Sequence, residues 1–292
     1  GGQAHIRVGA TLLADSDPIE EEKETELKAS AMLDVVRYCN AIALGETPVD
    51  EKMHAPSTQD IVVTERESEL DETTDEELHA EHALDEKARL DKPEVLLIDC
   101  EDSFVHTLAG YFRMCGATVH TRRVGFTKAE FEDDLVNLKP NLICLSPGPG
   151  SPSEFGLSWI IEESLKAKLP IFGVCLGLQA LVEYFGGELE QLDKPMHGKP
   201  SQIVLENESG IIFEGIDSPF QAGRYHSLIS KEDNLPAVLK ITAKTQEDGV
   251  IMAIEHESEP IAAVQFHPES IMTMDNQVGR QLIQNVVDNL AL

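Results

Sequence analysis

From residue 94 onward, short apolar runs alternate with longer stretches in which apolar residues recur at helical spacing. The apolar runs predict strands at residues 95–99, 117–122, 142–145 and 171–174, and the periodic stretches predict helices at residues 103–115, 128–137 and 156–167. Repeated strand–helix units of this length build a parallel sheet with helices on both faces. The functional loops of such a sheet lie at the carboxyl ends of its strands.

The pattern changes after residue 187. Shorter runs predict strands at residues 202–205, 224–229, 238–244, 250–254 and 261–266, and an amphipathic helix is predicted at residues 275–290. We therefore expect an α/β fold: an open, mostly parallel, twisted sheet flanked by helices, with a small antiparallel sheet. This domain would span residues 94–292.

The first 93 residues divide into two parts. Residues 1–44 contain a strand-like start and a helix that begins near Pro18, a piece too small to build its own core. We expect it to complete another domain. Residues 45–93 are acidic, with few large apolar side chains, which predicts a largely disordered linker. Glu21 and Glu24 share one helix face. By spacing alone they are more simply explained as an acidic first turn than as a metal site.

Composition excludes several classes of partner. Of the 292 residues, 41% are hydrophobic, and the formal net charge is −30, which disfavours nucleic acid and anionic membrane surfaces. No apolar run approaches the length that spans a membrane. The five cysteines have no disulfide-framework spacing, and the first residues do not resemble a signal peptide, so we expect reduced thiols and a cytoplasmic location.

Residues 170–181 place a cysteine between an apolar strand and a helix. Cys175 follows the predicted strand, with Gly173 and Gly177 on either side. Glycines there permit a tight strand-to-helix turn, and a helix N-terminus favours a thiolate. Most cysteines are inert core residues. Because a core cysteine requires no flanking glycines, we interpret Cys175 as a nucleophile.

His267 and Glu269 supply the other groups that an activated thiol needs. His267 directly follows the predicted strand at residues 261–266, and Glu269 follows two residues later. The imidazole would take the proton of Cys175 and pass it to the leaving group, while the carboxylate would orient the imidazole. The backbone N–H of Leu176 and those of loop 148–150 would bind the oxyanion. These residues indicate acyl transfer through a thioester on a small substrate.

Three separated motifs carry a family resemblance. Gly-Val-Cys-Leu-Gly-Leu-Gln at residues 173–179, Ser-Pro-Gly-Pro-Gly at 146–150 and Gln-Phe-His-Pro-Glu-Ser at 265–270 resemble the triad-type class I glutamine amidotransferases in order and spacing. The resemblance implies hydrolysis of the glutamine side-chain amide at Cys175, with release of ammonia and no cofactor in this domain. It also implies that glutamine is bound by Gly148, Pro149, Gly150, Gln179, Ser227 and Leu228.

The N-terminal segment carries a second resemblance, which narrows the expected function of the chain. Ile-Arg-Val-Gly-Ala-Thr at residues 6–11 and the helix that follows resemble the end of the chorismate-using component of anthranilate synthases. The whole chain thus resembles the C-terminal part of a fused anthranilate synthase. By this resemblance Glu21 and Glu24 would hold Mg²⁺ on chorismate, and the backbone at Gly9 and Ala10 would face that substrate. The remaining chorismate and magnesium residues would lie upstream of Gly1.

Several alternatives stay open from the sequence. The motifs fit an amidotransferase of aminodeoxychorismate synthase or of a phenazine-pathway aminodeoxyisochorismate synthase equally well. A stand-alone cysteine γ-glutamyl hydrolase is disfavoured by the fused synthase segment, and a non-catalytic interaction module by the presence of Cys175, His267 and Glu269. The expected partners are glutamine and an ammonia-accepting synthase domain, and homo-oligomerisation is left open.

Overall fold

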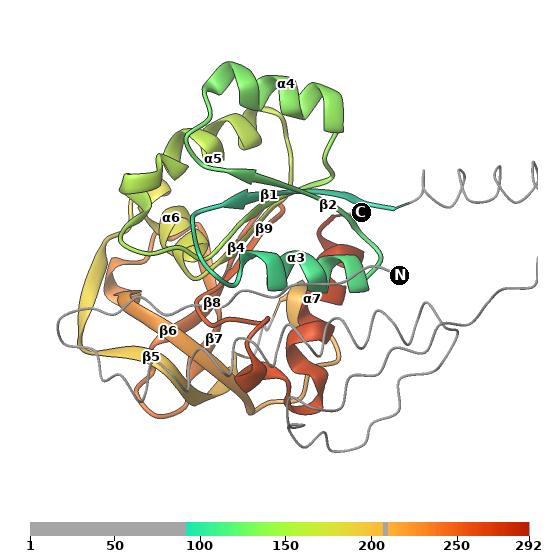
Figure 1. Ribbon diagram of the computed structural model, residues 1–292. Helices are drawn as coiled ribbons and strands as arrows, with labels where there is room; N and C mark the ends of the chain where they lie inside the picture. Colours follow the sequence, from blue (N-terminus) through green and yellow to red (C-terminus); the bar gives the residue numbers. More distant parts are fainter. Residues whose placement is uncertain (1–91, 207–209, 292) are drawn as a thin grey trace, which may run out of the picture. The chain divides into compact units, whose positions relative to one another are not determined.

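The computed structural model describes residues 92–206 and 210–291 (Figure 1). Residues 93–292 form one compact unit, which contains nearly all of the described residues. The expectations for residues 1–44, for the linker, and for Gly9, Ala10, Glu21 and Glu24 lie outside the described residues. They stay predictions.

Five parallel strands form one half of the sheet, in the order β2-β1-β3-β4-β9. Four of them match predicted runs closely: β1 (Glu94–Asp99), β2 (Thr118–Arg123), β3 (Leu142–Leu145) and β4 (Ile171–Val174). The fifth is β9 (Ile261–Val264). Nearly every residue of β1, β3, β4 and β9 is buried, as expected for parallel strands covered on both faces.

The antiparallel strands extend the same sheet rather than forming a separate small one. They are β8 (Ile251–His256), β7 (Leu239–Thr245), β5 (Leu189–Leu205) and β6 (Phe220–Ser230), in that order outward from β9. The separate sheet was a wrong expectation, because β9 pairs in parallel with β4 on one side and antiparallel with β8 on the other. One mixed sheet of nine strands results.

Helices cover both faces of the sheet (Figure 1). On one face lie α3 (Val105–Met114) and α7 (Val278–Asn289), and on the other lie α4 (Lys128–Leu138), α5 (Leu157–Lys166) and α6 (Leu176–Tyr184). Phe131 of α4 and Trp159 of α5 pack edge to face beside the buried side chains of β1, β3 and β4. Among the described residues, no helix combines the length and the apolarity needed to cross a membrane.

Two helix starts differ from the expectation. Helix α3 begins at Val105 instead of residue 103. Its N-cap is Phe104, which has no side-chain cap hydrogen bond, and the backbone N–H of Phe104 donates to Oδ1 of Asp102 at 2.7 Å just before the helix. Helix α7 begins at Val278 instead of residue 275. Asn276 and Gln277 adopt φ of 53° and 55°, which no α-helix includes, and they end a short 3₁₀ turn.

The topology brings three loops to one edge of the sheet. Strands β3, β4 and β9 are adjacent and parallel, so their carboxyl ends lie side by side. Loop 146–150 follows β3, Cys175 follows β4, and His267 and Glu269 follow β9. The predicted site residues from three distant parts of the sequence therefore meet.

Candidate active site

Cys175 sits on a strained turn between β4 and α6. Its φ of 52° and ψ of −97° are rare for a residue with a side chain, and it is the N-cap of α6. Its backbone N–H donates to the carbonyl of Val264 at 2.8 Å. A Cβ at Gly173 would lie 2.7 Å from the carbonyl carbon of Gly177, and one at Gly177 would lie 2.6 Å from the carbonyl oxygen of Leu145. Both glycines are therefore required by close backbone contacts.

His267 and Glu269 form a buried pair just beyond β9. Nδ1 of His267 lies 2.8 Å from Oε1 of Glu269, and both residues are at most 1% exposed. The backbone of His267 is held by β6, because its N–H donates to the carbonyl of Gly223 at 3.0 Å. Its own carbonyl accepts from Thr273 Oγ1 at 2.6 Å. The imidazole is thus fixed through both its ring and its backbone.

The charge state of His267 follows from its neighbours. Burial disfavours the charged ring, but the Glu269 carboxylate and the Cys175 thiol outweigh it and raise the pKa of His267 well above its ordinary value. Glu269 occupies Nδ1, so Nε2 is the nitrogen left for Cys175. The imidazole is a base strengthened by a carboxylate, as acyl transfer by a thiol requires.

Loop 146–150 packs directly against the turn that holds Cys175. A Cβ at Gly148 would lie 2.5 Å from Cδ2 of Leu176 and 2.8 Å from the carbonyl oxygen of Cys100, so only glycine fits. Ser146 holds the base of the loop by accepting from the N–H of Cys100 at 2.9 Å. The first N–H groups of α6, starting with Leu176, have no partner within the helix. Leu176 and the Gly148 backbone therefore lie together where an oxyanion site was predicted.

The residues predicted to bind glutamine come from helix α6, strand β6 and the loop after β3. Gln179, on α6, is 3% exposed and donates from Nε2 to the carbonyl of Leu228 on β6 at 3.1 Å. Ser227 and Leu228 are half-buried on β6. Pro149 and Gly150 are exposed at the end of the loop, and the N–H of Ser151 donates to Glu154 at 2.9 Å. Their contacts with a substrate stay predictions.

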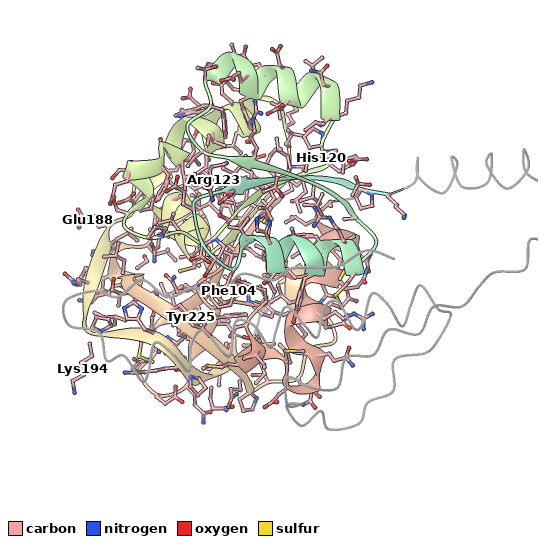
Figure 2. All side chains as sticks on the ribbon, viewed as in Figure 1. Phe104, His120, Arg123, Glu188, Lys194 and Tyr225 are labelled. Carbon is pink, nitrogen blue, oxygen red and sulfur yellow. The ribbon has the colours of Figure 1, made fainter. Side chains whose placement is uncertain are left out.

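Two aromatic residues near the imidazole were missed by the sequence reasoning. The ring centroids of Phe104 and Tyr225 lie 5.3 Å and 4.8 Å from that of His267, both in edge-to-face arrangements. Figure 2 shows the two side chains next to each other, one at the start of α3 and one on β6. Tyr225 also reaches Ser270 at 3.0 Å between their hydroxyl oxygens. Tyr225 lies two residues before Ser227, one of the residues predicted to bind glutamine, and this proximity is the one signal that could have found it.

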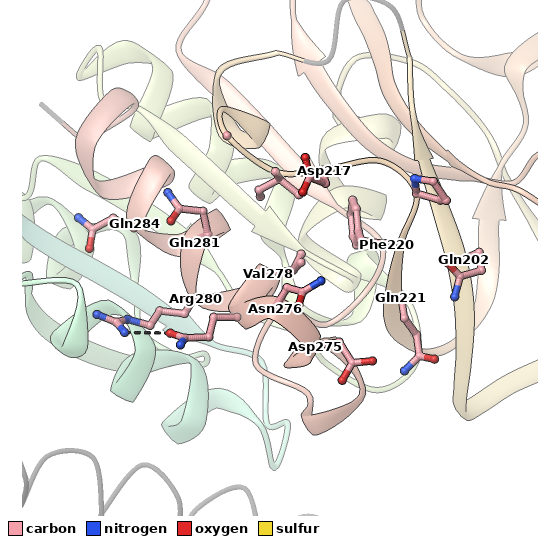
Figure 3. Close-up of a pocket in the computed structure, with 14 residues that line it drawn as sticks. Gln202, Asp217, Phe220, Gln221, Asp275, Asn276, Val278, Arg280, Gln281 and Gln284 are labelled. Atoms are coloured by element: carbon pink, nitrogen blue, oxygen red, sulfur yellow. Dashed lines mark hydrogen bonds between the residues drawn. The ribbon is translucent and has the colours of Figure 1, made fainter. Parts of the chain in front are cut away.

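A separate polar hollow of about 550 Å³ lies between the start of β6 and the start of α7 (Figure 3). Its lining includes Gln202, Gln221, Gln281 and Gln284, together with Arg280, whose NH1 donates to Gln277 Oε1 at 3.0 Å. None of the predicted site residues lines it. Its volume is therefore no guide to the catalytic chemistry, which is placed by Cys175 and His267.

Comparison with known proteins agrees with this arrangement. The family described as glutamine amidotransferase class-I matches residues 96–287, which include the cysteine turn, the loop after β3 and the His–Glu pair. The chain belongs to the class I glutamine amidotransferases. The resemblance inferred from the three motifs is therefore confirmed, and so is the α/β fold class.

Two curated relatives extend the comparison. An anthranilate synthase of Azospirillum brasilense is 42% identical over 290 residues, which is 99% of this chain and 34% of that protein. An aminodeoxychorismate/anthranilate synthase component 2 of Bacillus subtilis is 42% identical over 194 residues, which is 66% of this chain and 95% of that protein. This amidotransferase chain spans about a third of the first relative and nearly all of the second.

A solved structure shares the fold at lower identity. It is a putative GMP synthase component from Thermoplasma acidophilum, with a TM-score of 0.58 and 22% identity over 67% of this chain and 92% of that one. This likeness shows the fold alone. It supports the arrangement of the mixed sheet around the cysteine turn.

Proposed function

We propose that this amidotransferase hydrolyses glutamine through a thioester at Cys175 and supplies the ammonia to a synthase domain that converts chorismate to anthranilate. The observation that carries the first half is the buried His267–Glu269 pair, 2.8 Å apart, beside a cysteine on a strained turn. The second half rests on similarity to the Azospirillum anthranilate synthase along 99% of the chain, well beyond the amidotransferase domain.

The first step forms the thioester. His267 Nε2 takes the proton of Cys175, and the sulfur attacks the side-chain amide carbon of glutamine. The N–H groups of Leu176 and loop 148–150 stabilise the oxyanion of the tetrahedral intermediate. His267 then gives its proton to the amide nitrogen, the C–N bond breaks, and ammonia leaves. Glu269 keeps the imidazole oriented and stabilises its charged form.

The second step releases glutamate. Water attacks the thioester carbon while His267 takes one of the water protons. The C–S bond breaks, and the proton returns to the sulfur of Cys175. The net reaction consumes glutamine and water and yields glutamate and ammonia, so the triad is regenerated without any external oxidant or cofactor.

The synthase half is proposed from the N-terminal segment. Gly9 and Ala10 would face chorismate, and Glu21 and Glu24 would supply carboxylates to Mg²⁺, a hard cation that prefers such ligands. The described residues contain no group of three or more side chains suited to a metal. Glu21 and Glu24 lie outside the described residues, and the remaining magnesium ligands would lie upstream of Gly1. The cytoplasmic location stays a prediction.

The decisive experiment gives the full-length protein chorismate, Mg²⁺ and glutamine, and identifies the products. We expect anthranilate, with glutamate formed in equal amount. An aminodeoxychorismate product would favour the second candidate, which the name of the Bacillus relative supports. Glutamate without any chorismate-derived product would overturn the synthase half, and no glutamate at all would overturn the glutaminase half.

A further inference from the structure

A chain of hydrogen bonds connects the sulfur of Cys175 to strand β6. Nε2 of Gln265 lies 3.5 Å from Sγ of Cys175, and Oε1 of Gln265 accepts from Nε2 of Gln179 at 3.3 Å. The same Nε2 of Gln179 donates to the carbonyl of Leu228 at 3.1 Å. Gln265 is 0% exposed and Gln179 is 3% exposed, so water does not compete for these bonds.

The carbonyl of Leu228 sets the direction of this chain. A carbonyl oxygen can only accept, so Gln179 must present its NH₂ group to it. Gln265 must then present its oxygen to Gln179, which leaves its NH₂ group pointing at the sulfur. A reversed Gln265 amide would place its oxygen against Cys175 and its NH₂ against another NH₂. The fold therefore permits one orientation of Gln265.

A second side chain, His226, holds the same carbonyl, and Arg224 in turn holds His226. Nδ1 of His226 lies 3.0 Å from the oxygen of Leu228, so this nitrogen carries the proton. Nε2 of His226 accepts from Nε of Arg224 at 3.1 Å. Burial and the charge of Arg224 lower the pKa of His226 to about 3, which keeps the ring neutral with one donor and one acceptor. The carbonyl thus receives two directed N–H groups.

We propose that Gln265 is a further catalytic residue, which donates an N–H to the sulfur of Cys175, and that Gln179, His226 and Arg224 are positioning residues that orient this donor. Hydrogen bonds to an ionised group are stronger than those to a neutral one. The N–H of Gln265 therefore stabilises the thiolate more than the thiol, and it does so before substrate binds.

This proposal deepens the proposed function and rests on Cys175 being the nucleophile. The titratable groups that face Cys175 and His267 are Glu269 after β9 and His226 on β6, while Cys144 on β3 faces Glu269. Among the described residues, the side chain of Gln265 hydrogen-bonds to Cys175 and Gln179 and to none of these three groups. A shift in thiolate formation on changing Gln265 alone would thus report the loss of its N–H.

The test measures how fast iodoacetamide alkylates Cys175 in the full-length protein as a function of pH, with the modified residue identified by mass spectrometry. The variant Gln265→Met keeps the length of the side chain and removes the N–H. We expect the pH midpoint of alkylation to rise by about one unit, equivalent to roughly tenfold less thiolate below the midpoint. Glutamine hydrolysis should fall with it, in kcat more than in KM.

The matched control is Asn285→Leu on α7. Asn285 is also a buried amide with two donated bonds, to the carbonyls of Ile212 at 3.0 Å and Glu214 at 2.8 Å, but it is not part of the chain to Cys175. This variant should lose stability and keep the alkylation midpoint. The control shows whether a general loss of stability can move the midpoint.

The outcomes separate the two proposals. An unchanged midpoint in Gln265→Met overturns the role of Gln265, even where activity falls. If Gln265→Met does not fold, Gln265→Leu is measured in the same way, and failure of both to fold would assign Gln265 to core stability and overturn the proposal. Absence of glutamine hydrolysis in the unchanged protein would contradict the proposed function instead.

Discussion

Nδ1 of His267 lies 2.8 Å from Oε1 of Glu269, and both residues are buried. The carboxylate determines which imidazole nitrogen carries the proton, and it leaves Nε2 for Cys175. The pair is held by Gly223 and Thr273 through the backbone of His267, so its geometry does not depend on a bound substrate. This fixed orientation prepares the base before glutamine arrives.

Replacing Glu269 with Gln tests the electrostatic part of this arrangement. The carboxylate is what keeps the pKa of His267 raised against burial, so Glu269→Gln should lower that pKa. A raised histidine pKa stabilises the fold below the ordinary pKa near 6.5, and this contribution is lost as pH rises through the folded-state value. The variant should therefore lose stability most at acidic to neutral pH, measured by urea unfolding at several pH values.

The same variant should hydrolyse glutamine roughly 10³-fold more slowly, because the imidazole loses its orienting partner. Glu163→Gln on α5 is the control, since that carboxylate pairs with Lys128 at 2.8 Å, away from the site. Wild-type hydrolysis by Glu269→Gln would contradict the assigned role of the carboxylate.

Removing the nucleophile separates the two half-reactions. In the full-length protein, Cys175→Ala should reduce glutamine hydrolysis to background, because burial raises the thiol pKa of each other described cysteine and so disfavours its thiolate. Synthesis from chorismate should persist when ammonium salt replaces glutamine. Cys115→Ala, at the end of α3, should keep both activities. Glutamine-dependent synthesis by Cys175→Ala would refute the thioester at this residue.

Labelling should distinguish Cys175 from the other described cysteines. Burial raises the pKa of Cys100 to about 12 and that of Cys115 to about 11, and it also raises the pKa of Cys144 well above its ordinary value. A glutamine-analogue electrophile at neutral pH should therefore modify Cys175 first, as read by peptide mass spectrometry. Equal labelling of Cys175 and Cys100 would show that the turn does not activate its thiol.

The parallel half of the fold could be predicted because its strands are short apolar runs with clear ends. The expected ranges for β3 and β4 coincide with those observed, and α5 differs from its expected range, residues 156–167, by one residue at each end. Strand β5 was expected only at residues 202–205, yet it starts at Leu189. The first half of β5 carries exposed residues, and its register shifts opposite β6. It therefore lacks the alternation of apolar and polar residues that predicts a strand from sequence.

The candidate site, like the fold, could be predicted only in part from the sequence. Cys175 is marked by flanking glycines, and His267 and Glu269 are close together in sequence, so local chemistry indicates all three. Gln265 and His226 leave no comparable signal, because the partners of a buried amide or imidazole depend on which elements pack together. Only the contact of α6 with β6 turns these two residues into one hydrogen-bonded chain.

The turn at Cys175 makes a final prediction about stability. A Cβ at Gly177 would lie 2.6 Å from the carbonyl oxygen of Leu145, a backbone atom that cannot move without displacing β3. Gly177→Ala should therefore destabilise the domain by about 2–4 kcal/mol, within the range of strain from overpacking and forced backbone shifts. It should also displace Cys175, so glutamine hydrolysis should fall more than the folded fraction does.

Gly249→Ala is the matched control, because its Cβ would meet nothing within 4 Å and only its φ of +68° adds strain, about 1 kcal/mol. Urea unfolding midpoints and glutaminase rates at equal folded fraction would measure both effects. Equal losses in the two variants would show that the close contact with β3 is not what holds the turn.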